Sequence, residues 1–155
     1  MEDVKLISLD PNDLDHLNLM YAVRTHPEVD RELSQSPPHS FNAHVEYLQK
    51  TLQTGKKRFF LIGFQENLCG YCHVTGIETN TLELGFALHP LWWGKGIGKC
   101  AVCLLVQLLE GYNLTLIVKK SNLRALLLYQ KCGFVILKEN DNQEYLMEYS
   151  RDTET

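Results

Sequence analysis

The chain has 155 residues, 45% of them hydrophobic and 22% charged, with a formal net charge of −4. We assign residues 1–150 to a single domain and 151–155 to a disordered tail, and the acidic balance gives no reason to expect nucleic acid or an anionic membrane as a partner. No apolar run approaches the roughly 18 residues of a transmembrane helix and no signal-peptide pattern is found, so we expect a cytoplasmic protein.

The N-terminal third alternates between short regular elements and a loop. Residues 4–9 show the apolar alternation of a strand, and Pro11-Asn12-Asp13 opens a helical stretch that runs towards Arg24. Residues 24–40 hold three of the five prolines, so this segment is expected to be mostly loop. Ser40 is a suitable N-cap for a helix over 41–53, which Gly55 would end.

The remainder of the chain predicts a sheet with one helical crossover. Strands are expected at 58–65, 68–78 and 81–90 as an antiparallel meander, then a helix at 97–110, a strand at 114–118, a helix at 121–134 and strands at 135–139 and 144–149. The unit formed by 82–88, 97–110 and 114–118 requires two parallel neighbours and a right-handed connection. We therefore predict an α+β fold with a mixed, mostly antiparallel sheet and helices on both faces.

Four of the five cysteines form two C-x-x-C pairs, a layout also found in zinc ribbons. Cys69 and Cys72 lie in an expected strand, where a spacing of three puts their side chains on opposite faces. Cys100 and Cys103 lie in an expected helix, where a thiol behaves as a small hydrophobe. Because glycine-rich knuckle turns are missing, we expect reduced thiols and no metal.

The segment HPLWWGKGIGKC, residues 89–100, places three glycines just before a helix. The spacing of Gly94, Gly96 and Gly98 matches neither a P-loop nor a dinucleotide fingerprint. Two interpretations remain, a flexible strand-to-helix turn and an anion cradle. In a cradle, bare main-chain amides and the positive end of the helix hold a diphosphate, with Lys95 and Lys99 at its rim.

This glycine segment resembles the acyl-CoA loop of the GNAT superfamily of N-acetyltransferases, whose pattern is Gln/Arg-x-x-Gly-x-Gly/Ala. Gly96 and Gly98 fit, while Trp93 stands where Gln or Arg is usual and is either a marker of a branch or a core anchor under the loop. Pro-x-x-Trp-Gly-x-Gly is similar to the branch that modifies ribosomal-protein N-termini and nucleotide-linked amino sugars. Residues 118–134 resemble the family's next strand and helix, with Asn122 and Tyr129 at its functional positions, and the resemblance extends over roughly residues 55–150.

The resemblance implies direct transfer of an acetyl group from acetyl-CoA to an amine. The cofactor-binding residues it implies are Ala87, Leu88, Trp93, Gly94, Lys95, Gly96, Ile97, Gly98, Lys99 and Asn122. A main-chain N–H near Ala87 or Leu88 would stabilise the oxyanion where the strand diverges from its neighbour. Tyr129 would protonate the departing thiolate. Considered without the resemblance, Asn122 is a plausible N-cap and Tyr129 a half-buried aromatic.

The general base is less well defined. Several relatives carry a glutamate where this chain has Ile117, which cannot remove a proton. His73 is a candidate base or water-positioning residue because its unperturbed pKa is about 6.5, although a lone strand histidine also suits a packed core. Glu78 and Glu83 flank a turn and are expected to be solvated.

The acceptor region is expected in the first two helices and the loop between them. Residues 24–29 (RTHPEV) resemble a segment of the tryptophan-bearing branch and, with the helix carrying His44, the pseudaminic-acid type of amino-sugar acetyltransferase, which acetylates a 4-amino group on a UDP-linked sugar. This implies Arg24, His26 and His44 as substrate residues, with Arg31 as a further phosphate ligand. The same cluster could be a polar surface loop.

Three functions are compatible with these residues. The first is a cytoplasmic N-acetyltransferase for a nucleotide-linked amino sugar, and the second an acetyltransferase for protein N-termini or small amines. The third is a non-catalytic acyl-CoA-binding module, which Ile117 suggests and Tyr129 opposes. The expected partner is a small-molecule amine acceptor, and the expected state is a monomer or homodimer.

Overall fold

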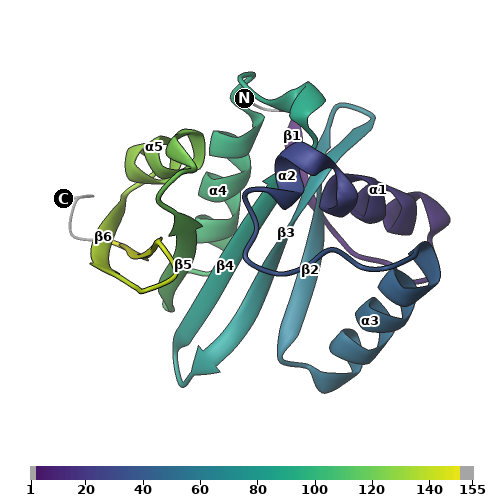
Figure 1. The fold of residues 1–155 in the computed structure, drawn as a ribbon, viewed down its shortest axis with the longest axis horizontal. Coiled ribbons are helices and arrows are strands. Elements are labelled where there is room, and N and C mark those ends of the chain that lie inside the picture. The colour runs from purple at the N-terminus through teal and green to yellow at the C-terminus, as the bar shows by residue number, and fades with distance from the viewer. Residues whose placement is uncertain (1–2, 151–155) are drawn as a thin grey trace.

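The computed structural model describes residues 3–150, and its seven strands form one sheet in the order β1-β2-β3-β4-β5-β7-β6 (Figure 1). The strands are β1 (Val4–Ser8), β2 (Lys57–Phe64), β3 (Asn67–Glu78), β4 (Thr81–Leu88), β5 (Asn113–Lys119), β6 (Phe134–Glu139) and β7 (Glu144–Tyr149). The helices are α1 (Leu14–Thr25), α2 (Pro27–Asp30), α3 (Phe41–Thr54), α4 (Ile97–Leu108) and α5 (Leu123–Lys131), with a 3-10 turn at Pro90–Trp92. The tail expected at 151–155 lies outside the described residues.

The sheet is mixed and mostly antiparallel. Only β4 and β5 pair in parallel, and α4 connects them, which confirms the predicted crossover. The strands β2, β3 and β4 form the predicted antiparallel meander. The α+β assignment is therefore confirmed.

Local signals set most helix boundaries. Asp13 caps α1 by accepting from the amides of Asp15 and His16, and Ser40 caps α3 by accepting from the amide of Ala43. Gly55 ends α3 in the left-handed conformation, φ 70°. Within the expected loop 24–40 the structure adds the short helix α2, which begins at a proline because proline is well suited to the first helical turn.

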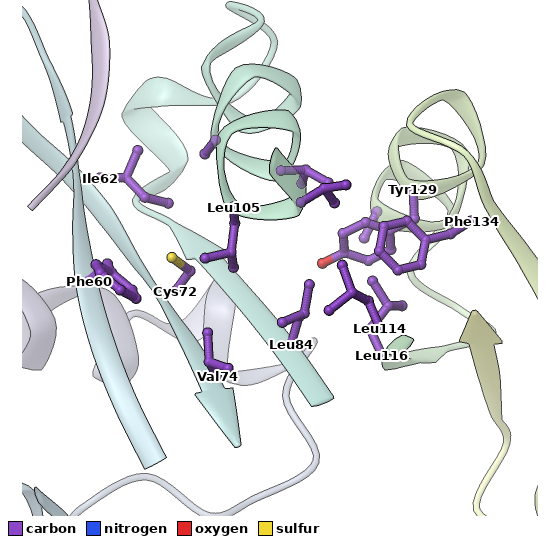
Figure 2. Close-up of a cluster of buried hydrophobic side chains, with 14 of the residues drawn as sticks. Phe60, Ile62, Cys72, Val74, Leu84, Leu105, Leu114, Leu116, Tyr129 and Phe134 are labelled. Carbon is purple, nitrogen blue, oxygen red and sulfur yellow. The ribbon is translucent and has the colours of Figure 1, made fainter. Parts of the chain in front are cut away.

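Two hydrophobic clusters lie on opposite faces of the sheet. One cluster packs α1, α2 and α3 against β2 and β3, and includes Met20, Val23, Leu48, Leu61 and Tyr71. The other packs α4 and α5 against the opposite face, and Figure 2 shows its members Phe60, Ile62, Cys72, Leu84, Leu105 and Tyr129. The helices therefore cover both faces, as predicted.

A bulge in β3 overturns one expectation from the sequence. Ile62 of β2 faces Gly70 and Gly63 faces Leu68, so Cys69 has no partner in the register. The extra residue shifts the alternation of side chains, and Cys69 and Cys72 are both fully buried in the α4-side cluster. The prediction that these two thiols face opposite ways was wrong for this reason.

The helix α4 ends two residues earlier than predicted. Leu108 is its last residue, and the side chain of Leu108 is 59% exposed rather than part of the core face. Within residues 3–150, none of the helices combines the length and the apolar character that crossing a bilayer would require.

Candidate active site

The sheet opens between β4 and β5. Their parallel ladder ends at the pair Leu84 and Leu116, whereas β4 continues to Leu88 beside β3 and β5 continues to Lys119 beside β7. Residues 85–88 therefore have a strand neighbour on one side only. This divergence lies where the resemblance predicted it.

The alternation of main-chain groups identifies which amide faces the opening. The amide of His89 donates to the carbonyl of Cys69 in β3 at 2.9 Å, while the carbonyl of Leu82 accepts a side-chain hydrogen bond from β5 at 3.4 Å. Odd-numbered residues of β4 thus point to β3 and even-numbered ones to the β5 side. By this alternation the amide of Leu88 faces the opening, and that of Ala87 faces β3.

A cavity of about 730 Å³ occupies this opening and continues beneath α1, α2 and α3. It therefore joins the two faces of the sheet. Among the residues of its wall near the opening are Leu88, Gly98, Ile117, Asn122, Arg124 and Tyr129.

The loop before α4 presents main-chain donors. Helix α4 begins after Gly96, which has a φ of 83°, and no side chain caps the helix. The amides of the first turn therefore have no side-chain acceptor, and they coincide with the positive end of the helix. Gly94 has a φ of 75°, and a Cβ there would have no heavy atom within 4 Å. This arrangement fits a diphosphate, with the exposed Lys95 and Lys99 beside it.

Two other residues of the loop have structural roles. The side chain of Ile97 is fully buried in the core, so only its amide is available to a ligand. Trp93 packs against the α1-side cluster, its Nε1 donates to the carbonyl of Leu88 at 3.0 Å, and the guanidinium of Arg124 lies 3.8 Å from its ring centroid. Of the two interpretations of Trp93, the contacts match the core anchor under the loop.

Tyr129 lies on α5 at the wall of the cavity. Its ring lies between those of Phe86 and Phe134, at centroid distances of 6.0 and 6.1 Å. Figure 2 shows its hydroxyl turned towards the side of Leu84 and Leu105 and away from Phe134. Burial raises the pKa of the Tyr129 phenol well above its ordinary value.

Asn122 immediately precedes α5 and has the capping role that its position suggested. Its Oδ1 accepts from the amide of Ala125 at 3.2 Å. The side-chain amide nitrogen of Asn122 is therefore the group that remains for a ligand in the cavity.

His73 lies on β3 on the α1 side of the sheet, in register with Gly85 of β4 and Phe59 of β2. A Cβ at Gly85 would lie 2.0 Å from His73 Nε2, so the imidazole occupies the space that glycine leaves. Burial, followed by the charge of Lys57, lowers the pKa of His73 to about 3. The argument for His73 from an unperturbed pKa was wrong, because the folded environment keeps this imidazole neutral.

The other candidates for a base differ in position. Glu83 lines the cavity, whereas Glu78 is exposed and does not. Ile117 also lines the cavity and leaves a hydrocarbon surface there, 46% exposed.

Two of the three predicted acceptor residues, Arg24 and His44, line the cavity, and His26 does not. Arg24 lines the cavity but binds Asp30, with 3.1 Å between Nη1 and Oδ1, and also donates to the carbonyl of Gln35. His26 lies outside the cavity wall, where its Nδ1 accepts from the amide of Glu28 as the N-cap of α2.

His44 is the acceptor candidate that is buried in the cavity wall. Its side chain is 4% exposed, and burial, followed by the charge of Arg24, lowers its pKa. His44 Nε2 and His73 Nδ1 are buried and have no hydrogen-bond partner among residues 3–150. Buried polar atoms nearly always have partners, so these two imidazoles in the cavity wall have hydrogen-bonding capacity that nothing in the described chain uses.

The α2–α3 loop, residues 31–40, crosses the acceptor side of the opening (Figure 1). Three contacts fasten it to the β5–β7 half of the molecule. Lys119 Nζ donates to the carbonyl of Arg31 at 2.9 Å, Arg124 binds Glu32 at 2.5 Å, and Ser34 donates to Glu144. The hydrogen bonds from Ser34 and Asn140 lower the pKa of Glu144, so this buried carboxylate is ionised.

Sequence reasoning missed several residues of this site. Lys57 could have been found, because alternation along β2 places it on the same face as Phe59 and Leu61. Nothing local could have identified Glu144, since its partner Ser34 is 110 positions away in the chain.

The chain was compared with known proteins. The family model described as "Acetyltransferase (GNAT) domain" matches residues 4–135. Two curated relatives are acetyltransferases named PseH from strains of Campylobacter jejuni. Each is 26% identical, over 88% of this chain and 88% of the relative in one case and 84% and 83% in the other.

Similar solved structures have the same fold. A spermidine N-acetyltransferase from Vibrio cholerae, solved with CoA and spermine, superposes with a TM-score of 0.82 at 20% identity and covers 96% of this chain and 94% of that one. An aminoglycoside acetyltransferase AAC(6′)-Ib, solved with coenzyme A, has a TM-score of 0.80 at 19% identity and covers 96% and 95%.

Proposed function

The chain belongs to the GNAT acetyltransferase family and is an acetyl-CoA-dependent N-acetyltransferase, and we propose that it acetylates the amino group of a nucleotide-linked amino sugar. We further propose that residues 1–150 act as one catalytic domain in the cytoplasm. The steps below are those that the residues of this chain would perform.

Acetyl-CoA supplies an acetyl group that is activated as a thioester. The first amides of α4 and those of residues 94–99 hold its diphosphate, and Lys95 and Lys99 add positive charge at the rim. The main-chain groups of Phe86, which point into the opening, would hold an amide of its pantetheine arm in place of a neighbouring strand. The side-chain nitrogen of Asn122 contacts this arm or the acceptor.

The amide of Leu88 stabilises the negative charge that develops on the carbonyl oxygen under attack. A fixed donor at this point lowers the barrier because it is already oriented before the charge appears. Leu88 is preferred to Ala87 because its amide faces the opening.

Tyr129 donates its phenolic proton to the departing sulfur. Burial raises the pKa of this phenol, so the proton that has to be given away is present throughout the neutral range. The aromatic contacts on both sides of the ring hold it in place.

His73 accepts a hydrogen bond from the attacking amine or from a water that carries the proton away. With a pKa of about 3 it is too weak a base to retain that proton. An amino-sugar amine has a lower pKa than a lysine side chain, so a larger share of it is neutral and little base assistance is required.

The single observation that carries the acceptor proposal is the pair of neutral, buried imidazoles in the cavity wall. Both side chains line the cavity, so the hydroxyls of a pyranose ring can hydrogen-bond to their imidazoles. A polyamine can do so only through its few amino groups, because its methylene segments have no hydrogen-bonding group. The similarity to the two PseH acetyltransferases and the resemblance of residues 24–29 to the pseudaminic-acid type support the same acceptor.

A second candidate is a small polyamine or aminoglycoside. The carboxylates of Glu83 and Glu144 in the cavity wall favour it, because they would attract a cationic acceptor. The printed ligand of the Vibrio cholerae neighbour, spermine, belongs to this class.

A thiol-release assay with acetyl-CoA separates the two. The acceptors are a UDP-linked 4-amino sugar, the same sugar without the nucleotide, spermidine, an aminoglycoside and a peptide with a free N-terminus. We expect kcat/KM for the UDP-linked sugar to exceed every other value by about tenfold or more, a difference of about 1.4 kcal/mol in transition-state binding. Preference for spermidine or the aminoglycoside would refute the proposed acceptor while leaving acetyl transfer intact.

A further inference from the structure

The acceptor side of the cavity has a floor made by three adjacent strands. In register across β2, β3 and β4, it consists of the rows Lys57–Thr75–Glu83, Phe59–His73–Gly85 and, because Leu61 of β2 is fully buried, the pair Tyr71–Ala87. The rows change from charged, through an imidazole, to apolar as they approach Leu88 and the opening. An acceptor lying along this floor thus has its amine at the apolar end and its far end beside the charged row.

Lys57 is a cation without a counter-ion in this wall. Its Nζ donates to the hydroxyl of Tyr47 at 3.3 Å and lies 5.3 Å from the ring centroid of Phe59. Within residues 3–150, no carboxylate forms an ion pair with it. Neutral rings and a hydroxyl leave its charge uncompensated.

The other cations of the wall are already neutralised. Arg24 is paired with Asp30 at 3.1 Å, and Arg124 with Glu32 at 2.5 Å. Glu83 belongs to the same row as Lys57 but lies two strands away, about 10 Å between main chains, so it does not replace a direct partner. Among the described residues of the wall, Lys57 is therefore the one cation left to attract an anion into the acceptor side.

The length of the floor sets a requirement on the acceptor. From Glu83 to Leu88 is five residues along β4, or roughly 17 Å. A single pyranose ring with its amine at Leu88 does not reach the charged row, whereas an acceptor extended by a diphosphate and a nucleoside does. Tyr47 lies beside Lys57 in the wall and is 45% exposed, so its ring is available for stacking.

We infer that Lys57 and Tyr47 form the site for the nucleoside-diphosphate part of the acceptor. Lys57 Nζ binds a phosphate oxygen, and the ring of Tyr47 stacks on the base while its hydroxyl orients Lys57. This inference rests on the proposed nucleotide-linked acceptor and names the residues that select it. It also gives a reason for rejecting polyamines, because Lys57 repels a second positive charge at the far end of the floor.

The direct test measures binding of UDP to protein saturated with CoA, so that the diphosphate cradle at α4 is already filled. We expect Lys57→Gln to weaken UDP binding by about tenfold or more, the usual effect of losing a hydrogen bond to a charged group. Lys57→Arg should retain most of the affinity. The matched control is Lys56→Gln, because Lys56 is the exposed neighbour outside the cavity and its replacement removes the same charge.

A second pair of variants tests the stacking. Tyr47→Phe retains the ring and should bind UDP within a few-fold of the wild type, whereas Tyr47→Ala should lose at least about fivefold. In turnover, Lys57→Gln should raise KM for the UDP-linked sugar, leave KM for acetyl-CoA unchanged and improve the use of spermidine.

The failures of the two proposals are distinguishable. Equal UDP affinity in the wild type and Lys57→Gln, or no UDP binding by a wild type that acetylates the UDP-linked sugar, overturns the Lys57 site and leaves the proposed acceptor standing. UDP binding that depends on Lys57, in a protein that acetylates no nucleotide-linked sugar, supports the Lys57 site and refutes the proposed acceptor.

Discussion

Two buried side chains of the site illustrate how one physical cause acts on opposite kinds of group. Burial disfavours a charged form, so it raises the pKa of the phenol of Tyr129 and lowers the pKa of the imidazole of His73. Both groups are therefore neutral at pH 7. The phenol keeps a proton to give, and the imidazole keeps a lone pair that accepts a hydrogen bond.

Replacement of Tyr129 tests the proposed acid. We expect Tyr129→Phe to lower kcat by about 10²- to 10⁴-fold, because the proton for the departing sulfur is lost, while the Kd for CoA changes little. Stopped-flow turnover and calorimetric CoA binding are the measurements. Tyr145→Phe, on a partly buried tyrosine of β7, provides the control. Wild-type turnover in Tyr129→Phe would exclude the assignment.

The lowered pKa of His73 predicts a pH dependence of stability. Between the folded pKa of about 3 and the ordinary histidine pKa of about 6.5, the unfolded chain binds the proton and the folded chain does not. The contribution of His73 to the free energy of unfolding is therefore complete above pH 6.5. This contribution is lost as the pH falls, by up to about 2 kcal/mol between pH 6.5 and pH 5. Urea unfolding at pH 7 and pH 5 should show that the free energy of unfolding falls less for His73→Gln than for the wild type. The control is His39→Gln, at an exposed position, whose free energy of unfolding should fall by as much as that of the wild type.

Among the elements, the start of α4 is the feature on which the proposed cofactor binding depends. A capping side chain is absent there, and Gly96 takes a left-handed conformation that places the following amides around an open space. A stability argument alone would favour a serine or aspartate cap at this position. Their absence is consistent with a helix end that is reserved for a ligand.

Replacement of Gly96 tests this element. Ala at a φ of 83° should cost roughly 1–2 kcal/mol of stability and raise the Kd for CoA, because the loop has to rearrange. Gly111→Ala, at a φ of 97° beyond the other end of α4, carries a comparable backbone cost and should leave the Kd unchanged. Chemical denaturation and titration with CoA measure the two effects. Equal Kd changes in both variants would mean that the loop responds to general destabilisation only.

The sequence predicts elements well where the signal is local. Ser40 and Gly55 mark both ends of α3, because capping depends on residues within one turn. Prediction failed where tertiary packing decides. The bulge at Cys69 depends on the pairing of β3 with β2, and Leu108 has helical spacing but no neighbour to bury it.

In the molecule as a whole, the β1–β4 half of the sheet is hydrogen-bonded to the β5–β7 half through a short ladder that ends at Leu84 and Leu116. The cradle at α4, the amide of Leu88 and the hydroxyl of Tyr129 come from different elements around that division. A ligand within the opening would contact both halves, so its binding free energy should add to the stability of the folded state.

Saturation with CoA should therefore raise the thermal stability. At a concentration 100 times the Kd, linkage predicts about 2.7 kcal/mol, which corresponds to a rise in Tm of roughly 5–10 °C for a domain of this size. Thermal unfolding monitored by circular dichroism measures it, with Gly96→Ala expected to show a smaller rise at the same CoA concentration. Hydrogen exchange should slow in β4 and α5 together, and slowing confined to one half would contradict binding across the opening.

The residues that we propose for the cofactor side, among them Gly96, Gly98, Asn122 and Tyr129, could be named from the sequence because they lie in short contiguous segments. The acceptor side could not. Arg24 was predicted to grip phosphate, yet Asp30 and Gln35 already engage it, and the uncompensated charge belongs to Lys57 on another element. Which cation lacks a partner depends on distances between segments, and spacing along the chain contains no such information.

The fastening of the α2–α3 loop has a consequence for engineering. Its anchors, Lys119, Arg124 and Glu144, belong to β5, α5 and β7. The shape of the acceptor entrance therefore depends on residues that are far apart in the sequence. A hybrid that exchanges only the first forty or so residues for those of a homologue would inherit a loop with mismatched attachment points. Transplanting substrate preference therefore requires the distant anchors to be exchanged together with the segment they secure.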